Sequence, residues 1–533
     1  RSWRWGSILL WFPEEVHSFM TAAADTPKIG LISPYSNLSA IGLRHISSSL
    51  QRAGYATRMI FLPDPDELYY KAKSPPSQYT EAVLDQVCDL CADLDLIGIT
   101  LMSNYVGRAR SLTDAVHERL GIPVVWGGIH PTVRPEESLK WADFVCVGEG
   151  EDAIVELVHS IELGASQYDI QNIWWRDAQG QIHANPNRPI TQNLDELALP
   201  DYDLDRQFIL NDGQIEPLTP PLLAHHLMHN FARQTRLAYM LSATRGCPFR
   251  CTFCCDNALS KMFAGWSKLR RRSPQNLLAE IQVICAVLPQ LEAVMLIDST
   301  FLAVSDDWLE EFANLYRREV GLPFFIQTTP GSIKEHKLQL LVEAGLADVG
   351  MGLQSGSARM RSLYHRFETN EQIVESGRLL QKHRAAIPYP SYDVISDNPY
   401  ESYEDQLETL NLLYRLPRPH LLHFFSLTFY PGTDMYELAK TDGFISDDEV
   451  DIYAKSYIKL QPNYYNFVLW CLHRNLPHWV LLPMIQPISL RLFSFPIFAW
   501  LFTFIYRLIA MTRGLDAQFK HFRQVRTYLR PQL

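Results

Sequence analysis

The sequence predicts an α/β protein with two successive α/β domains and a helical, apolar C-terminal region. Three observations support this. Continuously apolar runs alternate with amphipathic helical stretches, a pattern typical of parallel sheets covered on both faces. A segment of little periodicity divides that pattern into two series. Finally, the chain has 533 residues, more than the roughly 250 to 300 that one hydrophobic core organises.

The first series begins at Pro27 and predicts a doubly wound, Rossmann-like domain over residues 27–160. Helical patterns at 40–53, 80–92 and 108–120 separate its strand candidates. These strands are "KIGLISP", "ATRMIFLP", "LDLIGITLM", "IPVVWGG" and "DFVCVGEGE". Because open α/β sheets bind ligands at the carboxyl ends of their strands, we expect a ligand there.

Residues 161–236 are interpreted as a hairpin followed by a linker. The hairpin is "NIWWRDAQGQIHANP", with its turn at residues 177–180, where Asp and Gly favour chain reversal. From Ile190 to Arg236 the sequence carries proline and acidic turn residues with little periodicity. We therefore expect little regular structure in that stretch.

The second series predicts a βα barrel of partial TIM type over residues 237–440. Its six strand candidates are "LAYMLSATRGC", "AVMLIDSTF", "PFFIQTTPG", "ADVGMGLQSGS", "PYPSYDVISDNP" and "LLHFFSLTFYPGT". In such barrels the chemistry lies at the carboxyl ends of the strands. A dense group of cysteines directly follows the first of these strands.

The C-terminal region, residues 441–533, contains the most apolar stretch of the chain, residues 479–511. Its last 20 residues approach the length that spans a bilayer, but Pro496 and Arg507 interrupt them. Three interpretations stay open: a buried or lid helix, a helix lying on a membrane surface, and a true span.

Composition narrows the functional classes. A net charge of -11 argues against non-specific nucleic-acid binding. The basic run "KLRRRS", residues 268–273, is interpreted as a solvated face, with a phosphate or carboxylate contact as the alternative. The nine cysteines are odd in number, and five of them are scattered, which does not suggest a disulfide framework. The N-terminal apolar run is too short for a signal-peptide core, so we expect a cytoplasmic protein, with membrane association left open.

The remaining four cysteines lie within "RGCPFRCTFCCDN". Cys247, Cys251 and Cys254 form C-x3-C-x2-C, and three thiolates on one tight loop can hold three irons of a [4Fe-4S] cluster. Structural zinc and unligated thiols are the alternatives. Cys255 is the fourth cysteine and our candidate catalytic residue, although its role is open. Cys88 and Cys91, upstream on a helical pattern, are interpreted as core thiols.

With this spacing after a first barrel strand, the chain resembles the radical S-adenosylmethionine (SAM) superfamily. The resemblance implies that the open iron chelates the methionine moiety of SAM. It also implies that one-electron reduction yields a 5'-deoxyadenosyl radical. Further segments are similar: "GMGLQSGS" has Gln354 where the family usually has Glu, and "LIDSTF" keeps Asp298 but has Ser299 for the second acid. The implied SAM-binding residues are Phe253, Asp298, Gly352, Gln354 and Ser355.

The N-terminal run "WGGIHPTVRPEESLKWADFVCVGEGED", residues 126–152, resembles the cobalamin-binding domain fused upstream of one large radical SAM class. The implied cobalamin contacts are Ser103, Gly127, Gly128, His130, Gly148 and Glu149. The chain has no D-x-H-x-x-G motif, so cobalamin is expected base-off, and His45 is interpreted as a helix residue. A domain that has lost its cobalamin is the alternative.

Together these resemblances predict a cobalamin-dependent radical SAM enzyme that methylates an unactivated carbon. A radical SAM cyclase or ring-rearranging enzyme is the first alternative, and a non-catalytic iron-sulfur redox or sensor protein the second. A methylthiotransferase fits less well, because the sequence has no second cysteine triad upstream. The expected partners are an unidentified small-molecule, lipid or peptide substrate and an electron donor such as flavodoxin or ferredoxin. No nucleic acid is expected, and residues 479–511 are the candidate for peripheral membrane contact.

Overall fold

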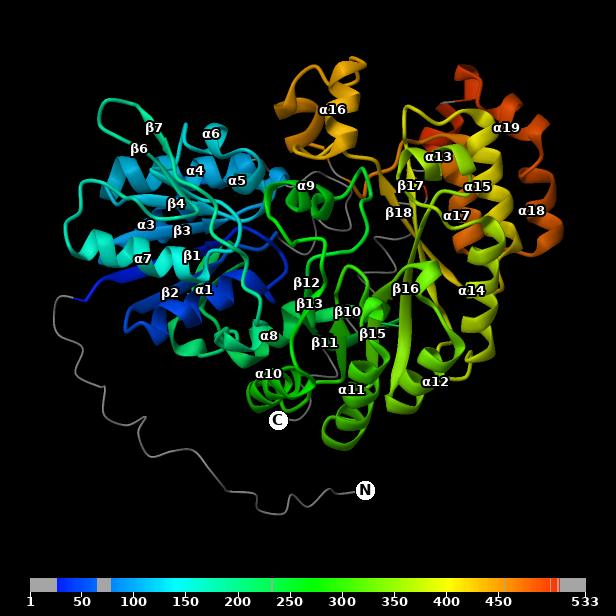
Figure 1. Ribbon diagram of the computed structural model, residues 1–533. Helices are drawn as coiled ribbons and strands as arrows, with labels where there is room; N and C mark the ends of the chain where they lie inside the picture. Colours follow the sequence, from blue (N-terminus) through cyan, green and yellow to red (C-terminus); the bar gives the residue numbers. More distant parts are fainter. Residues whose placement is uncertain are drawn as a thin grey trace.

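The computed structural model describes residues 26–64, 78–231, 233–455, 457–498, 500–505 and 508 (Figure 1). Two large sheets lie side by side. The first has nine strands in the order β7-β6-β5-β4-β3-β1-β2-β8-β9, and the second has seven in the order β10-β11-β14-β15-β16-β17-β18. The predicted α/β class, with two successive domains, is confirmed.

The first sheet contains the five strands predicted from the first apolar series. They are β1 (Lys28–Ser33), β2 (Ala56–Phe61), β3 (Leu96–Thr100), β4 (Val124–Gly127) and β5 (Phe144–Cys146), all parallel. Its larger helices are α1 (Ile41–Arg52), α3 (Glu81–Cys91), α4 (Val106–Leu120) and α7 (Glu151–Glu162), and the short α5 (Ile129–Val133) and α6 (Pro135–Ser138) follow β4. Helices α1 and α7 pack on one face and α3 and α4 on the other, because alternate strand residues join two separate cores. The doubly wound architecture is confirmed.

The chain changes direction across this sheet at β1, which pairs with β2 on one side and β3 on the other. The loop after β1 and the 3-10 turn η2 (Ser103–Tyr105) after β3 therefore leave the sheet next to each other. Open α/β sheets bind their ligands at such a switch point.

The segment after the first domain is more ordered than the sequence indicated. The predicted hairpin is confirmed as β6 (Ile173–Arg176) and β7 (Ile182–Ala184), at the β5 edge. The interpretation of residues 190–236 as a linker is wrong: β8 (Gln207–Asn211) pairs with β2, and β9 (Gln214–Pro217) pairs with β8. Helix α8 (Pro220–His226) and strand β10 (Met228–Phe231) follow. Strands this short carry too few residues for an alternation to be recognised.

The six predicted strands of the second sheet are confirmed, all parallel. They are β11 (Gln234–Leu241), β14 (Ala293–Leu296), β15 (Phe324–Thr328), β16 (Leu346–Gln354), β17 (Ser391–Ser396) and β18 (Leu421–Ser426). β10 adds to β11 as an antiparallel edge strand. Within the described residues β10 and β18 are the two ends of the sheet and do not pair, so the barrel is partial.

Helices follow the barrel strands in βα order. They are α10 (Pro274–Val287), α11 (Asp306–Glu319), α12 (Glu335–Ala344), α13 (Ala358–Leu363), α14 (Asn370–Lys382) and α15 (Tyr403–Arg415). Between β11 and α10 lie a small ribbon of β12 (Thr244–Arg245) with β13 (Arg270–Arg271), and helix α9 (Cys255–Met262). In Figure 1 α9 lies between the two sheets.

The C-terminal region is helical as far as the structure describes it. After α16 (Asp434–Thr441) and the π-helix η7 (Glu449–Tyr453) come α17 (Tyr464–His473), α18 (His478–Met484), α19 (Pro487–Phe493) and the 3-10 turn η8 (Pro496–Phe498). Prolines begin α19 and η8, which divides the apolar stretch into short helices. No helix in the described residues is both long and apolar enough to cross a bilayer. Residues 499, 506, 507 and 509–511 of the predicted apolar segment lie outside the described residues.

Candidate active site

The cysteine loop occupies residues 246–254, between β12 and α9. Gly246 begins it with a φ of +86°, and a Cβ there would lie 2.3 Å from the Trp266 carbonyl oxygen. Only glycine fits this left-handed, crowded position. Thr252 secures the far side of the loop, because its amide donates to the Tyr364 carbonyl at 3.3 Å and its hydroxyl to Leu363 at 2.7 Å.

The three cysteines of the motif lie on one short loop. Cys247 and Cys251 are buried and Cys254 is half-buried. Burial raises the pKa of Cys247 to about 12, and the nearby Cys251 and Cys254 also raise it. In the described part of the chain no three His, Cys, Asp or Glu side chains converge on a single metal ion. Three thiols on a four-iron cluster each bind a different iron, so a clustered but wider arrangement fits.

Arg366 connects this loop to the glycine segment at the end of β16. Its Nη1 lies 3.7 Å from the Cys251 sulfur, and its Nη2 donates to the Gly352 carbonyl at 2.8 Å. Burial raises the pKa of Cys251, and the Arg366 cation opposes that rise. A buried guanidinium beside a thiolate offsets part of the negative charge that the thiolate brings. The cation also forms an ion pair with Glu368 at 3.3 Å.

The residues predicted to contact SAM lie around this loop, and their contacts with SAM stay predictions. Phe253 meets Tyr364 edge to face at 5.3 Å between ring centroids. Gln354 ends β16 with a φ of +68°, beside Gly352. Ser355 is buried, and its hydroxyl lies 3.1 Å from the Thr409 hydroxyl of α15.

Asp298 follows β14, and its carboxylate is already surrounded by donors. It accepts hydrogen bonds from the Thr244 amide and hydroxyl, both at 2.6 Å, from the Ala243 amide at 3.2 Å and from the Ser242 hydroxyl at 3.1 Å. Burial raises the pKa of Asp298 while these bonds lower it. The carboxylate therefore positions the turn that leads into the cysteine loop.

Cys255 begins α9 and is exposed. The neighbouring Asp256 accepts hydrogen bonds from Ser299 at 2.7 Å and Trp266 at 3.0 Å. Burial raises the pKa of Tyr430, a hydrogen bond with Asn104 opposes this, and Cys255 is close enough to contribute. Cys255 thus lies near Tyr430, which also interacts with Asn104 of η2.

In the first domain, His130 and Ser103 come together while the glycines shape the strand ends. The Nδ1 of His130 lies 3.1 Å from the Ser103 hydroxyl, and its Nε2 has no hydrogen-bond partner among the described residues. Burial, assisted by Arg134, lowers the pKa of His130 to about 3, so the imidazole is neutral. Gly128 has a φ of +105°, and a Cβ there would lie 2.8 Å from the Leu101 carbonyl oxygen. Gly127 ends β4 beside it.

His45 lies within α1, as predicted, and its Nδ1 is 2.8 Å from the Ala198 carbonyl oxygen. Cys88 and Cys91 are buried in the core, also as predicted.

Gly148 and Glu149 face the barrel domain. A Cβ on Gly148 would lie 2.5 Å from the Phe263 ring. Glu149 forms ion pairs with Arg270 at 2.8 Å and with Arg245 at 3.2 Å, and Glu151 binds Arg245 at 2.5 Å. Arg245 lies two residues before Cys247, so these acids join the first domain to the approach of the cluster loop. Cobalamin contacts by residues 148 and 149 stay predictions.

The structure corrects the prediction for the basic run at residues 268–273, which the sequence indicated to be a solvated face. Arg270 and Arg272 are buried. Arg270 pairs with Glu149, and Arg272 pairs with Glu280 of α10. Arginines alternate sides on a strand, so only the intervening Arg271 faces solvent. The alternative, a carboxylate contact, is the one observed.

The ligand-binding edges of the two domains meet. Asn37, in the loop after β1, places its Nδ2 3.5 Å from the sulfur of Met240 on β11. Asn104 of η2 donates to the Lys455 carbonyl at 2.9 Å. The switch point of the first sheet thus faces the barrel domain, where a corrin bound to the first domain would lie next to the barrel. The glycines and the unpaired nitrogen of His130 at this edge fit such a ligand.

A polar group that the sequence did not indicate lies on the inner face of the second sheet. His423 of β18 places its Nδ1 3.1 Å from Asp393 of β17, which also accepts from Gln327 of β15 at 3.3 Å. The Leu422 side chain is buried in the same core as Val468 of α17, so His423, its neighbour on the strand, points to the opposite face of the sheet. The His423 side chain is 47% exposed, so its other nitrogen is accessible.

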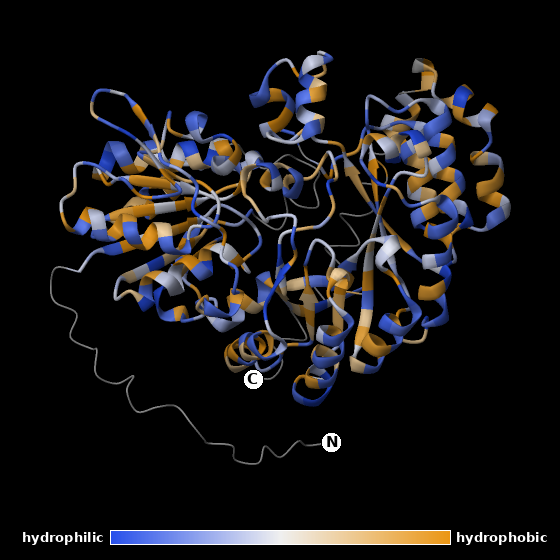
Figure 2. Cartoon of the chain, viewed as in Figure 1, coloured by the Kyte–Doolittle hydropathy of each residue, from blue (hydrophilic) through white to orange (hydrophobic). Residues whose placement is uncertain are grey.

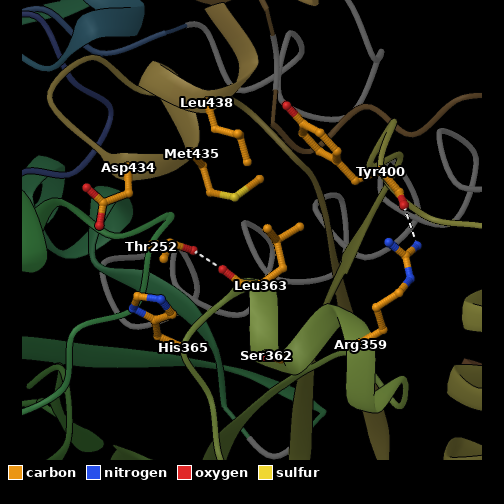
Figure 3. Close-up of a pocket in the computed structure, with 9 residues that line it drawn as sticks. All are labelled: Thr252, Arg359, Ser362, Leu363, His365, Tyr400, Asp434, Met435 and Leu438. Carbon is orange, nitrogen blue, oxygen red and sulfur yellow. Dashed lines mark hydrogen bonds between the residues drawn. The ribbon is translucent and has the colours of Figure 1, made fainter. Parts of the chain in front are cut away.

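A cavity of about 610 Å³ lies on the outer side of the cysteine loop, between α13 and α16 (Figure 3). Its lining comprises Thr252, Arg359, Ser362, Leu363, His365, Tyr400, Asp434, Met435 and Leu438. The Thr252 hydroxyl is bonded to Leu363, and Arg359 donates to the Tyr400 carbonyl at 2.6 Å. This lining includes none of the residues predicted to bind SAM or cobalamin.

Sequence reasoning missed Arg245, Arg366, Asp393 and His423. Arg245 had a usable signal, since it stands two residues before the first motif cysteine. Arg366 had none, because 115 positions separate it from the cysteine it contacts. Asp393 and His423 lie on different strands and become a pair only through the parallel register of β17 and β18.

Two protein families match the chain. The B12 binding domain matches residues 27–158, and the Radical SAM superfamily matches residues 241–413. The chain therefore carries one domain for cobalamin and one for a four-iron cluster with SAM.

Relatives match at low identity. The anaerobic magnesium-protoporphyrin IX monomethyl ester cyclase of Rubrivivax gelatinosus is 25% identical over 378 residues, 66% of this chain and 60% of that protein. The bacteriochlorophyllide d C-8(2)-methyltransferase of Chlorobaculum tepidum is 23% identical over 414 residues, 74% of this chain and 80% of that protein. The solved structure of the radical SAM methyltransferase TsrM from Kitasatospora setae has the same fold, with a TM-score of 0.60 at 15% identity, over 78% of this chain and 76% of that one. Together with the cysteine loop and the facing strand ends, the two family matches place this chain in the radical SAM enzymes that carry an N-terminal B12-binding domain.

Proposed function

We propose that this protein transfers a methyl group to an unactivated carbon of a small molecule, lipid or peptide. The observation that carries the proposal is the facing arrangement of the two domains, with Asn37 against Met240 and Glu149 against Arg245. When bound, the cluster with SAM supplies a radical that abstracts hydrogen, and cobalamin supplies a transferable methyl group. A substrate between the two strand edges would be within reach of both.

The chain's own residues hold this arrangement. Cys247, Cys251 and Cys254 are the cluster ligands, and Arg366 offsets the charge of the buried Cys251. The pairs of Arg245 with Glu149 and Glu151 fix the cysteine loop against the first domain. Because these pairs are largely buried, they restrict water and hold the two edges in register.

We assign the substrate contact inside the barrel to His423. Its Nδ1 is bonded to Asp393, so its Nε2 can donate to, or accept from, a polar group of the substrate. Burial lowers the pKa of His423, but the hydrogen bond and charge of Asp393 outweigh this and raise it. The protonated, donating form is thereby favoured. A carbonyl or carboxylate oxygen is the matching substrate group.

A cyclase or ring-rearranging enzyme is the second candidate, because a cyclase is among the relatives that match this chain in sequence. SAM labelled with deuterium on its methyl group separates the two. The anaerobically reconstituted enzyme is incubated with a metabolite extract, and products are read by mass spectrometry. A labelled methyl group in a product supports methyl transfer, and an unlabelled rearranged product supports the cyclase. Absence of 5'-deoxyadenosine after reduction would leave only a redox or sensor protein.

The proposal includes an electron donor of the flavodoxin or ferredoxin type, because reductive cleavage of SAM consumes one electron. It also includes a cytoplasmic location, since the ligating thiols have to stay reduced. Nucleic acid is not part of it, given the net charge of -11.

A further inference from the structure

The last described helices present a row of large apolar side chains to solvent. We call this row the C-terminal apolar face. Its side chains belong to α18, α19 and the residues after them, and they are between 49% and 79% exposed. They are Trp479, Leu482, Ile488, Leu492, Phe495, Ile497, Trp500, Phe504 and Leu508. Single exposed apolar residues are common, but a group this dense marks a contact surface.

The opposite sides of the same helices already supply the core. Leu481 of α18 and Leu490 of α19 are buried, as are Ile485 and Phe502. Each helix is therefore apolar on two sides, and packing against the barrel satisfies only one. A helix that is apolar all round needs a second apolar environment. Figure 2 shows apolar residues along α18 and α19, at the edge of the molecule away from the first domain.

The charge of this region is opposite to that of the whole protein. The sequence contains no Asp or Glu between Asp451 and Asp516, but six Lys and Arg residues, whereas the whole chain carries -11. Of these cations, Lys459, Arg474 and Arg491 are described and exposed. Arg491 pairs with Glu404 of α15 at 3.0 Å, a solvent-exposed ion pair that contributes little. The segment that carries the face thus combines exposed apolar side chains with a sequence that has basic but no acidic residues.

We propose that the C-terminal apolar face docks the protein on the surface of a membrane containing anionic lipids. Trp479 and Trp500 are suited to the interface between headgroups and acyl chains, where tryptophan is enriched. Lysine and arginine beside an apolar face are attracted to anionic headgroups. A second copy of the chain is the weaker occupant, because a two-fold contact would bring two positive regions together. The proposal concerns the surface only and does not depend on methyl transfer.

Vesicle flotation of the full-length protein tests the proposal. The probes are vesicles of phosphatidylcholine alone, and of phosphatidylcholine with an equal part of phosphatidylglycerol. We expect flotation with the anionic vesicles and much less with the neutral ones. The combined variant Trp479→Ser, Ile488→Ser and Trp500→Ser should lower the partition coefficient by at least about tenfold, because three large apolar contacts are lost. Circular dichroism shows whether this variant is folded.

A matched control replaces exposed apolar residues elsewhere on the chain: Leu163→Ser, Val283→Ser and Val450→Ser. This control should float like the unchanged protein. Failure of the unchanged protein to float, or equal flotation of both variants, would overturn the proposal. A dimer that the first variant converts to a monomer, without vesicle binding, would assign the face to a second copy. Flotation seen only after removal of residues 509–533 would assign it to the chain's own C-terminus.

Discussion

The barrel domain contacts the rest of the chain at two junctions of different composition. Towards the first domain the contact combines buried ion pairs of Glu149 and Glu151 with Arg245 and Arg270, and an apolar cluster that includes Val147 and Phe263. Towards the C-terminal helices it is apolar: Val468, Leu469 and Leu472 of α17 are fully buried, and Leu481 and Leu490 join the same core. The charged junction lies beside the cluster loop, and the apolar one lies on the far side of the barrel (Figure 1).

The two junctions differ in how precisely they fix the relative position of the segments that meet there. Charged pairs accept few geometries, because each buried donor has to meet its acceptor. Apolar packing tolerates several arrangements of similar volume. The junction beside the cluster loop therefore adds ion pairs to its apolar contacts, whereas apolar packing dominates the outer junction.

The largest expected effect comes from the loop that the charged junction positions. Cys251→Ala should abolish formation of 5'-deoxyadenosine, because a three-cysteine site loses an iron ligand. Bound iron and sulfide should fall with it. Cys255→Ala is the matched control and should retain its iron. If Cys255→Ala instead lost the cluster while Cys251→Ala kept it, our ligand assignment would be wrong.

Breaking the charged junction should destabilise the fold. Arg270→Leu leaves Glu149 with Arg245 as its remaining cation in a buried setting, so we expect the free energy of unfolding to fall by at most about 3–5 kcal/mol. Urea unfolding followed by tryptophan fluorescence measures it. Arg271→Leu, its exposed neighbour, should change stability little, and Glu149→Gln combined with Arg270→Leu should recover part of the loss. Equal effects of Arg270→Leu and Arg271→Leu would contradict this reading of the junction.

Two neighbouring leucines of α18 allow the buried and exposed sides of one helix to be compared. Leu481 is buried in the core that contains α17, and Leu482 belongs to the C-terminal apolar face. Leu481→Ala should lower the unfolding free energy by about 2–5 kcal/mol, because it leaves a cavity. Leu482→Ala should stay within about 0.5 kcal/mol. The two variants are compared by chemical denaturation without lipid. A larger loss of stability in Leu482→Ala than in Leu481→Ala would show that Leu482 is the buried residue.

A carboxyl group near the apolar junction should make the stability of the protein depend on pH. Burial, with the charges of Asp405 and Asp397, raises the pKa of Glu401 from 4.5 to about 8, and neither carboxyl oxygen has a hydrogen-bond partner among the described residues. The folded state holds this proton more tightly than the unfolded one. Its contribution to stability is therefore full below about pH 4.5 and is lost as the pH rises through about 8.

Glu401→Gln removes this dependence. Between about pH 5 and pH 8 the melting temperature of the variant should fall less than that of the unchanged protein. Glu404→Gln, on the exposed start of α15, serves as the control. If the melting temperatures of the Glu401 variant and the unchanged protein fell equally over this pH range, the pKa of Glu401 would not be raised in the folded protein.

The smallest effect concerns the inner face of the barrel, between the two junctions. Asp393→Asn should lower the pKa of His423, because the hydrogen bond and charge that raise it are lost. Asp348→Asn should lower it less, since Asp348 acts only through its charge. Nuclear magnetic resonance of protein labelled at its histidines follows this titration directly. An unchanged His423 pKa in the Asp393 variant would show that the two side chains do not interact.

Much of this protein could be read from its sequence. The strand runs, the helices between them and the C-x3-C-x2-C loop are local patterns, in which neighbouring residues carry the signal. The short strands of residues 207–217 could not be read in this way, because their pairing with β2 supplies hydrogen bonds that no local pattern records. The same holds for the buried arginines of residues 268–273, whose partners lie more than a hundred positions away in one case.

The sequence by itself determined the fold class, the order of the domains and the C-x3-C-x2-C loop, because each depends on spacing within a short stretch. Only the tertiary structure decided which charges pair at the junction, that Arg366 lies against Cys251, and that His423 meets Asp393. It also decided which side of α18 and α19 is left exposed. Contacts of this kind arise when distant segments pack together, and the physical cost of burying a charge without its partner selects them.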